Sequence, residues 1–261
     1  MLVAECVACV RGSRTVLSGI DLALPAGQVL GVLGANGAGK TTLLATLAGE
    51  HAAGSGRLSL GGQPVGDMRP AELARRRAVL PQSAHLAFDL DARDVVAMGG
   101  YPFPELSPVA LHELVEKALA IADAQAFAAR RHGTLSGGEQ QRVQFARVLV
   151  QLLAARRRDE HRLLLLDEPI ASLDPKHQIG LLAAVARLAR EEGIAAVVVL
   201  HDVNLAAAWC HRLLLLGDGR GIALGPPGAV LTTGNLERAY DMAVNVLPHP
   251  LRPDQPLVLF G

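Results

Sequence analysis

Length, composition and charge limit what this chain can do. It has 261 residues, 50% of them hydrophobic, and its 25 Lys and Arg residues equal its 25 Asp and Glu residues in number. A net charge of zero removes the general basic field behind most non-specific affinity for nucleic acid, and an aromatic content of 3% leaves few rings for base stacking. We therefore expect one large domain with a sizeable core, and no nucleic-acid partner.

The first residues and the apolar runs predict a chain outside the membrane. No uncharged apolar run reaches the roughly 18 to 20 residues that a membrane-spanning helix needs. Residues 1–9 carry Glu5 and no basic segment, unlike a secretory signal peptide. Cys6 and Cys9 form a CxxC pair, but a strand over residues 2–10 points them to opposite faces, so we interpret them as small hydrophobic residues. We expect a soluble, cytosolic protein.

The first third of the chain reads as short strands separated by turns. Strands are expected at residues 2–10, 14–24, 28–33 and 57–60. After the third of these, a glycine-rich stretch from Gly34 to Thr42 leads into leucines at helical spacing, which predicts a strand, a loop and a helix in succession. Gly61 and Gly62 predict a hairpin turn after the fourth.

Helical patterns take over from about Asp91 and later alternate with strands. Ser107 followed by Pro108 predicts a helix start, and apolar residues then recur on one face. Further strands are expected at residues 163–166 and 196–200, with a long helix between them, and then a closing hairpin of 213–216 and 220–224 and a short helix at 236–243. Strands separated by helices imply an α/β fold with a parallel sheet buried on both faces.

The segment Gly34-Ala35-Asn36-Gly37-Ala38-Gly39-Lys40-Thr41 matches the phosphate-loop pattern GxxxxGK[ST]. Its glycines let the backbone wrap a phosphate, the helix that starts near Lys40 adds its positive end, and the Thr41 hydroxyl suits Mg²⁺. Such a match arises by chance in roughly one chain of this length per hundred, and the predicted strand before it and helix after it strengthen the assignment. The candidate phosphate-binding residues are Gly34, Asn36, Gly37, Ala38, Gly39, Lys40, Thr41 and Thr42.

A second motif is an apolar strand that ends in two acids. Four leucines at 163–166 precede Asp167 and Glu168. Ligands of open α/β sheets bind at the carboxyl ends of strands, so Asp167 is placed to hold a Mg²⁺ shell and Glu168 to polarise a water. A strand that merely ends in solvated charges is the alternative, and the phosphate loop argues against it.

The third motif, Leu135-Ser136-Gly137-Gly138-Glu139, predicts a helix that starts at Ser136 with a capping box. Two glycines in that first turn cost roughly 1 kcal/mol each relative to alanine, a poor choice for helix stability alone. They suit a backbone that another group approaches closely, such as an anion held by the helix N-terminus.

These three motifs, in this order, resemble those of the ATP-binding subunits of ABC transporters, and the resemblance covers nearly the whole chain. It implies an α/β P-loop NTPase core with a mostly parallel sheet, an N-terminal antiparallel β subdomain and an inserted helical subdomain. Within a single domain of residues 1–261, the nucleotide-binding core with its antiparallel part would take 1–90 and 160–225. The helical signature subdomain would take 91–159 and a C-terminal tail 226–261.

The resemblance also implies roles for residues outside the three motifs. Gln82 resembles the Q-loop glutamine, which contacts Mg²⁺ and the attacking water. Asp174 resembles the D-loop acid at the dimer contact, and His201, directly after a predicted strand, resembles the switch histidine that holds the γ-phosphate.

ATP and Mg²⁺ are the cofactors that the resemblance implies, and the activity is ATP hydrolysis. Thr41, Gln82 and Asp167 would organise Mg²⁺, with Glu168 as general base. Two subunits would sandwich two nucleotides head to tail, each lying between one P-loop and the residues 136–139 of the other chain. Hydrolysis would then weaken the clamp and let the dimer open.

A narrower resemblance points to the haemin-import ATP-binding proteins, among the importers of iron chelates and vitamin B12. It rests on Val95–Gly99, the Arg-rich insertion Gln151–Arg162 and the ending Val246–Pro250. It implies a homodimer at the cytoplasmic face of the inner membrane that powers a permease dimer for haem, with a periplasmic or surface substrate-binding protein as an indirect partner. Iron-siderophore complexes and vitamin B12 are the alternative cargoes.

Two other classes of P-loop protein compete with a transporter subunit. ABC ATPases of chromosome maintenance and DNA repair share the signature, but they need long heptad arms or a basic DNA face, which this sequence lacks. A stand-alone P-loop kinase would leave the segment from Leu135 to Gly138 unexplained.

Four positions depart from the family pattern. Arg11 stands where the family usually stacks an aromatic ring on adenine, and its planar guanidinium is suited to stack in that place. Ile170 stands where threonine is common. Gly100 and Phe103 stand where close relatives tend to have Arg and His, in a region where contact with the permease is expected.

Arginine runs at residues 75–77, 130–131 and 156–158 are interpreted as solvated faces. Contact with a permease or with anionic lipid heads is the alternative.

Overall fold

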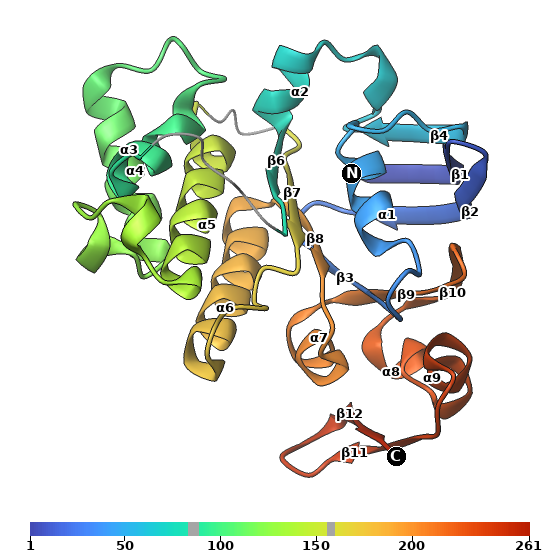
Figure 1. Cartoon of the computed structure of the whole chain (residues 1–261). Coiled ribbons are helices and arrows are strands. Elements are labelled where there is room, and N and C mark those ends of the chain that lie inside the picture. The colour runs from blue at the N-terminus through green and yellow to red at the C-terminus, as the bar shows by residue number, and fades with distance from the viewer. Residues whose placement is uncertain (83–88, 156–159) are drawn as a thin grey trace.

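The computed structural model describes residues 1–82, 89–155 and 160–261, and Figure 1 shows their arrangement. The strands are β1 (Leu2–Arg11), β2 (Arg14–Leu24), β3 (Val29–Gly34), β4 (Ser55–Leu60), β5 (Gln63–Pro64), β6 (Arg77–Leu80), β7 (Leu163–Asp167), β8 (Ala195–Val199), β9 (Arg212–Gly217), β10 (Arg220–Gly225), β11 (Val244–His249) and β12 (Arg252–Phe260). The α-helices are α1 (Lys40–Leu47), α2 (Pro70–Arg76), α3 (Ala92–Ala97), α4 (Pro108–Ile121), α5 (Gly137–Leu153), α6 (Pro175–Glu192), α7 (Val203–Trp209), α8 (Pro227–Val230) and α9 (Thr233–Tyr240).

A six-stranded sheet of order β10-β9-β3-β8-β7-β6 forms the centre of the fold. Its neighbours pair in parallel except for the antiparallel hairpin of β9 and β10. Strands β3, β7 and β8 are buried along their whole length. The leucines of β7 alternate between two cores, with Leu163 and Leu165 on the side of α1 and Leu164 and Leu166 on the side of α5 and α6. The predicted α/β fold is confirmed.

The N-terminal strands form a second, antiparallel sheet of order β2-β1-β4-β5, as the family resemblance implies. Gly219, in the turn between β9 and β10, joins it to the central sheet. A Cβ atom at Gly219 would lie 2.1 Å from the carbonyl oxygen of Val16, and the Gly219 carbonyl accepts a hydrogen bond of 2.9 Å from the Ser18 N–H. Cys6 is exposed and Cys9 buried, which confirms that they lie on opposite faces of β1.

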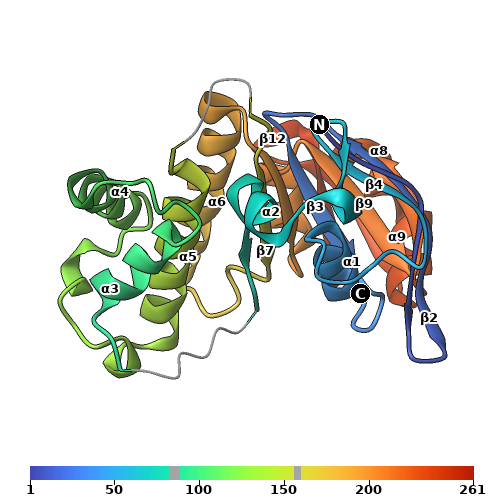
Figure 2. The same ribbon diagram turned by 90° about the horizontal axis from the view of Figure 1, so that it is seen from above.

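Helices α3 and α4 pack on α5, and Figure 2 shows this group on the opposite side of the molecule from the N-terminal strands. The start of α4 is the predicted one, because the Ser107 hydroxyl accepts a hydrogen bond of 3.2 Å from the Ala110 N–H and Pro108 is the first helical residue. The apolar residues Val115 and Leu119 of α4 are buried. In the described ranges, every helix falls short of the length and apolarity that a membrane span requires.

Phe103 does not face outward, so the expectation that it lies on a permease-contacting surface is wrong. Its side chain is only 2% exposed. The guanidinium carbons of Arg75 and Arg162 lie 4.6 and 5.4 Å from the centre of its ring, an arrangement that favours an aromatic side chain through both burial and cation–π attraction. Glu105 also forms an ion pair with Arg75, which closes this cluster on the outside.

The arginine runs divide between internal and solvent-facing roles. Arg77 is half-buried and donates to the main-chain oxygen of Ala48, so the prediction of a solvated face is wrong for this residue. Arg131 is exposed, as predicted. The run at 156–158 lies outside the described residues.

The C-terminal segment contains more secondary structure than the short helix that the sequence predicts. The short helix occupies α9 and not 236–243, because the Thr232 hydroxyl caps its start and Asp241, with a φ of 53°, ends it. An antiparallel hairpin of β11 and β12 follows and was not predicted, since prolines argue against strands. The Asn204 carboxamide of α7 holds this hairpin by accepting from the Val258 N–H at 2.8 Å and donating to the Val258 carbonyl at 3.0 Å.

Candidate nucleotide-binding and catalytic site

The glycine-rich loop between β3 and α1 has the backbone shape of a phosphate cradle. Gly34 has a φ of 146°, and a Cβ atom there would lie 2.4 Å from the main-chain oxygen of Leu216. Gly39 has a left-handed φ of 100° directly before α1. Only glycine adopts these conformations without strain, so both positions need glycine for the loop itself. The loop exposes the N-terminus of α1, so that a phosphate group can accept hydrogen bonds from its N–H groups.

Lys40 closes the loop from inside. Its ammonium donates to the carbonyl oxygens of Gly34 at 2.8 Å and Ala35 at 3.0 Å, and only 6% of the residue is exposed. Burial lowers the pKa of Lys40, while the nearby charges of Glu168 and Asp167 oppose that shift. The ammonium is therefore already in the cradle, and phosphate oxygens can replace the two carbonyls as its acceptors.

Asp167 ends β7 and is buried, with 3% of the residue exposed. Its Oδ1 accepts no hydrogen bond from any residue in the described ranges, and the neighbouring Thr41 hydroxyl acts to lower the pKa of the carboxyl group. Burial raises the pKa of Asp167 because its charged form loses solvation. A buried carboxylate oxygen without a donor, beside a hydroxyl, is the ligand set that a hard cation such as Mg²⁺ takes, so these residues fit the metal.

Glu168 is the centre of the predicted catalytic group. It directly follows β7 and has a left-handed φ of 48°. Oε1 lies 2.6 Å from Nε2 of His201, and Oε2 accepts a hydrogen bond of 2.9 Å from Nε2 of Gln82. Three residues predicted to act on the γ-phosphate and the water therefore meet, although 86 positions separate Gln82 from Glu168.

The sheet order explains why these groups gather. Strands β6, β7, β8 and β3 lie in parallel, so their carboxyl ends meet at one edge of the sheet. Gln82 follows β6, Asp167 ends β7 and Glu168 follows it, His201 follows β8, and the glycine-rich loop follows β3. A cavity of about 130 Å³ adjoins Glu168 and His201 at this edge.

The start of α5 has the predicted capping box. The Ser136 hydroxyl accepts from the Glu139 N–H at 3.3 Å, and a Glu139 carboxylate oxygen accepts from the Ser136 N–H at 2.8 Å. Arg130 donates to the other carboxylate oxygen of Glu139 at 3.0 Å. The hydrogen bond from the Ser136 backbone is the main cause that lowers the pKa of Glu139.

The two glycines of this turn have different surroundings. A Cβ atom at Gly138 would lie 2.9 Å from the main-chain oxygen of Ser172, whereas one at Gly137 would come no closer than 3.9 Å to the Ser172 side chain. Gly138 therefore needs to be small because the chain's own backbone approaches it. Of these two glycines, only Gly137 fits the predicted explanation, in which a group from outside the chain approaches the backbone closely.

Asp174 caps α6. Its carboxylate accepts from the His177 N–H at 3.0 Å, and both its oxygens lie 2.8 Å from Nδ1 of the His177 ring. Arg11 is exposed at the end of β1, opposite Arg14 in the β1–β2 register. Its stacking on adenine stays a prediction.

Sequence reasoning missed the carboxamides that shape the segment after Glu168. Gln141 of α5 donates to the carbonyl of Pro169 at 3.3 Å, and Gln178 of α6 donates to the carbonyls of Ile170 and Leu173 at 3.3 and 3.0 Å. No pattern in the sequence marks these contacts, because they join helices on either side of a loop. His177 was missed for the same reason.

Comparisons with known proteins agree with this geometry. The family model described as ABC transporter matches residues 17–171. The hemin import ATP-binding protein HmuV of Bordetella parapertussis is 53% identical over 249 residues, which cover 95% of each chain. The protein of the same name from Pseudomonas putida is 48% identical over 259 residues, which cover 99% of each chain.

Solved structures share the fold. A putative metal-chelate type ABC transporter in an inward-facing conformation matches with a TM-score of 0.78 and 24% identity, covering 100% of this chain and 96% of its own. A dimeric bacterial ABC transporter cassette matches with a TM-score of 0.76 and 25% identity, covering 87% of this chain and 98% of its own. The family model spans more than half of the residues and the relatives nearly all of them, so the chain belongs to the ABC transporter family.

Proposed function

We propose that this chain is the ATP-hydrolysing subunit of an importer for haemin. The meeting of Gln82, Glu168 and His201 beside the glycine-rich loop carries the enzymatic part of this proposal, because an acid, a ring nitrogen and a carboxamide converge where a γ-phosphate would end. The cargo is supported by the relatives, which are hemin import ATP-binding proteins about half identical to this chain over nearly its whole length.

The nucleotide phosphates would bind to the loop amides of residues 34–42 and to Lys40. Lys40 would exchange the carbonyls of Gly34 and Ala35 for phosphate oxygens, which are stronger acceptors because they are charged. Mg²⁺, held by Thr41, Gln82 and Asp167, would supply positive charge to the β- and γ-phosphate oxygens.

Glu168 would act as the general base. It would accept one proton from the attacking water as the new oxygen–phosphorus bond forms and the bond to the β-phosphate oxygen breaks. His201 contacts one carboxylate oxygen of Glu168 and Gln82 the other, so the carboxylate is oriented before the water arrives. His201 would also donate to the γ-phosphate, at a side chain that is half exposed and so within reach of a ligand.

Two copies would complete each site, head to tail. Ser136 and Gly137 are exposed at the N-terminus of α5, a helix of 17 residues. Among the described residues, the capping box leaves the N–H groups of Gly137 and Gly138 free to meet an anion. Each nucleotide would lie between the loop of one chain and residues 136–139 of its partner. Asp174 would stand at the same contact.

The dimer would work at the cytoplasmic face of the inner membrane on a permease dimer. A periplasmic or surface substrate-binding protein would deliver the cargo. In such a system the permease and binding protein select the cargo, so iron-siderophore complexes and vitamin B12 are the alternatives to test.

The test is transport by the protein reconstituted with its co-purified permease in liposomes. We expect haemin uptake that requires ATP on the side of this subunit and ATP hydrolysis that the permease stimulates. Uptake of a ferric siderophore or vitamin B12 in place of haemin would contradict the cargo. Hydrolysis that DNA stimulates and the permease does not would contradict the transporter assignment.

A further inference from the structure

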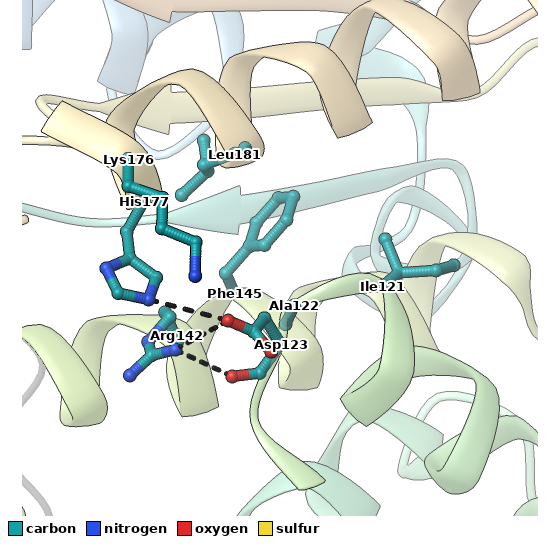
Figure 3. Close-up of a pocket in the computed structure, with 9 residues that line it drawn as sticks. Ile121, Ala122, Asp123, Arg142, Phe145, Lys176, His177 and Leu181 are labelled. Atoms are coloured by element: carbon teal, nitrogen blue, oxygen red, sulfur yellow. Dashed lines mark hydrogen bonds and ion pairs between the residues drawn. The ribbon is translucent and has the colours of Figure 1, made fainter.

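Four side chains link the signature helix α5 to the residue that caps α6 (Figure 3 labels three of them). Arg142 of α5 donates to the Asp123 carboxylate at 3.1 Å. The same Asp123 oxygen lies 3.4 Å from Nε2 of His177, whose Nδ1 lies 2.8 Å from both carboxylate oxygens of Asp174. The linkage therefore runs Arg142–Asp123–His177–Asp174 and joins the ends of α4, α5 and α6.

The end of the linkage on the helical side is fixed. Asp123 follows α4 with a left-handed φ of 52°, and Arg142 donates to its carbonyl at 2.7 Å as well as to its carboxylate. The Arg142 guanidinium lies 4.9 Å from the centre of the Phe127 ring, and its side chain is 15% exposed. One hydrogen bond to the carboxylate and one to the carbonyl hold Asp123 relative to α5, and the stacking on Phe127 fixes the Arg142 guanidinium that donates both.

Within this linkage His177 joins Asp123 to α6. The ion pair of Lys117 with Glu192 at 3.9 Å joins α4 to the far end of α6. The imidazole of His177 is a rigid ring with one nitrogen toward Asp123 and the other toward Asp174. A displacement of α5 would therefore be passed to His177 through Asp123. Because His177 is also bonded through its N–H to Asp174, the D-loop acid follows the ring.

Behind the linkage, apolar packing between the same helices is incomplete. A cavity of about 130 Å³ lies between the linkage and the apolar side chains of Ile121, Phe145 and Leu181. It is also lined by Asp123, Arg142 and His177 (Figure 3). Apolar groups that face a void lack contact partners across it, so they resist relative motion less than a close-packed core does. The charged linkage is thus the connection that holds α5 and α6 together near their N-termini.

We propose that His177 is a positioning residue that couples the position of signature helix α5 to that of Asp174. The inference rests on the proposed function, in which α5 meets the nucleotide of the partner chain and Asp174 stands at the same contact. When the partner's nucleotide binds to the N-terminus of α5 and α5 moves towards it, Arg142 and Asp123 move His177 with the helix. Asp174 then moves into its position at the contact with the partner chain. The affinity of the chain's own glycine-rich loop for ATP does not depend on this linkage.

The test compares steady-state ATP hydrolysis by the full-length protein with His177→Ala, Asp123→Asn, the double variant and His112→Ala, a matched control at an exposed histidine on α4. We expect His177→Ala and Asp123→Asn each to lower kcat by about fivefold or more, the lower range of measured coupling between sites, with KM for ATP little changed. The double variant should lose no more than His177→Ala alone, because both changes break the same linkage. His112→Ala should match the unchanged protein.

The outcomes separate this inference from the function on which it rests. If the unchanged protein and His112→Ala hydrolyse ATP and His177→Ala does so at the same kcat, the inference is wrong and the proposed function stands. Losses that multiply in the double variant also overturn it. If the unchanged protein does not hydrolyse ATP, the proposed function fails and the inference with it. Asp123→Asn preserves shape, so it keeps the test decisive if thermal melting shows that His177→Ala does not fold.

Discussion

Nε2 of His201 lies 2.6 Å from Oε1 of Glu168, across two neighbouring parallel strands. The pairing of Asp167 with Val199 in the β7–β8 register sets this distance, because Glu168 and His201 each follow the paired positions closely. The acid and the histidine are therefore oriented by the sheet itself. A base that is oriented before the substrate binds needs little reorganisation during the reaction.

Replacing Glu168 by Gln removes the proposed base and keeps the shape of the side chain. Turnover should fall by at least about 100-fold, the usual contribution of a general base, while nucleotide binding is retained. Phosphate release under saturating ATP and titration with a fluorescent nucleotide measure the two quantities. Glu113→Gln, at an exposed position of α4, is the control. Near-normal turnover in Glu168→Gln would remove Glu168 from its role.

Replacing Lys40 by Ala should abolish nucleotide binding itself. The ammonium donates to the Gly34 and Ala35 carbonyls, so its loss leaves the loop without the charge that neutralises the phosphates. Titration with a fluorescent nucleotide should show no saturation at concentrations that saturate the unchanged protein. Unaltered affinity would show that the phosphates bind elsewhere.

The two glycines of the signature turn should respond differently to alanine. Gly138→Ala would place a methyl group 2.9 Å from the Ser172 oxygen, so we expect a loss of about 1–3 kcal/mol in the free energy of unfolding. Gly137→Ala has space for its methyl group, so the free energy of unfolding should stay the same or rise by at most about 1 kcal/mol. Urea denaturation measures both changes.

Activity completes that comparison. If the partner's nucleotide approaches Gly137, Gly137→Ala should lose about tenfold in turnover, equivalent to about 1.4 kcal/mol, despite its undiminished stability. A Gly137→Ala variant with full turnover would argue that no ligand approaches this turn.

Asp167→Asn should raise stability and destroy activity. Burial raises the pKa of Asp167, so the folded protein holds the proton more strongly than the unfolded chain does. The group's contribution to stability therefore falls as pH rises from the ordinary Asp pKa of 3.8 through the raised folded value. The melting temperature of Asp167→Asn, measured with EDTA and no nucleotide, should exceed that of the unchanged protein most at neutral pH and least in acid.

Asp67→Asn, at an exposed aspartate, serves as the control for the same substitution on the surface. If the gain in melting temperature of Asp167→Asn is constant or shrinks towards neutral pH, Asp167 is not a buried carboxylate that lacks a cation partner. Mg²⁺-dependent ATP hydrolysis should be lost in Asp167→Asn alone.

Much of the fold could be predicted from the sequence because local patterns encode it. The run of buried leucines in β7, the Ser107 cap and the Ser136 capping box each follow from a few neighbouring residues, and the structure confirms all three. The β11–β12 hairpin could not be predicted, since its docking depends on the distant Asn204, and prolines weaken the strand pattern.

In the candidate site, too, local patterns predicted some features and missed those that depend on distant contacts. Motif spacing identified the glycine-rich loop, Asp167 and Glu168. Phe103 was misplaced because its burial comes from Arg75 and Arg162, which lie far away in the sequence. The reason for Gly138 was incomplete, because the approach of Ser172 is a tertiary contact that no local pattern encodes.

The head-to-tail dimer that shares its nucleotides is the central claim, and a disulfide crosslink tests it most directly. Cysteines would replace Ser136 and Asn36, both exposed, in the Glu168→Gln background, with exposed Cys6 replaced by Ser and buried Cys9 and Cys210 retained. With ATP and Mg²⁺, oxidation should yield a covalent dimer, and each protein that carries only one of the two introduced cysteines should remain monomeric on a denaturing gel. A double-cysteine protein that stays monomeric while ATP is bound would contradict the account.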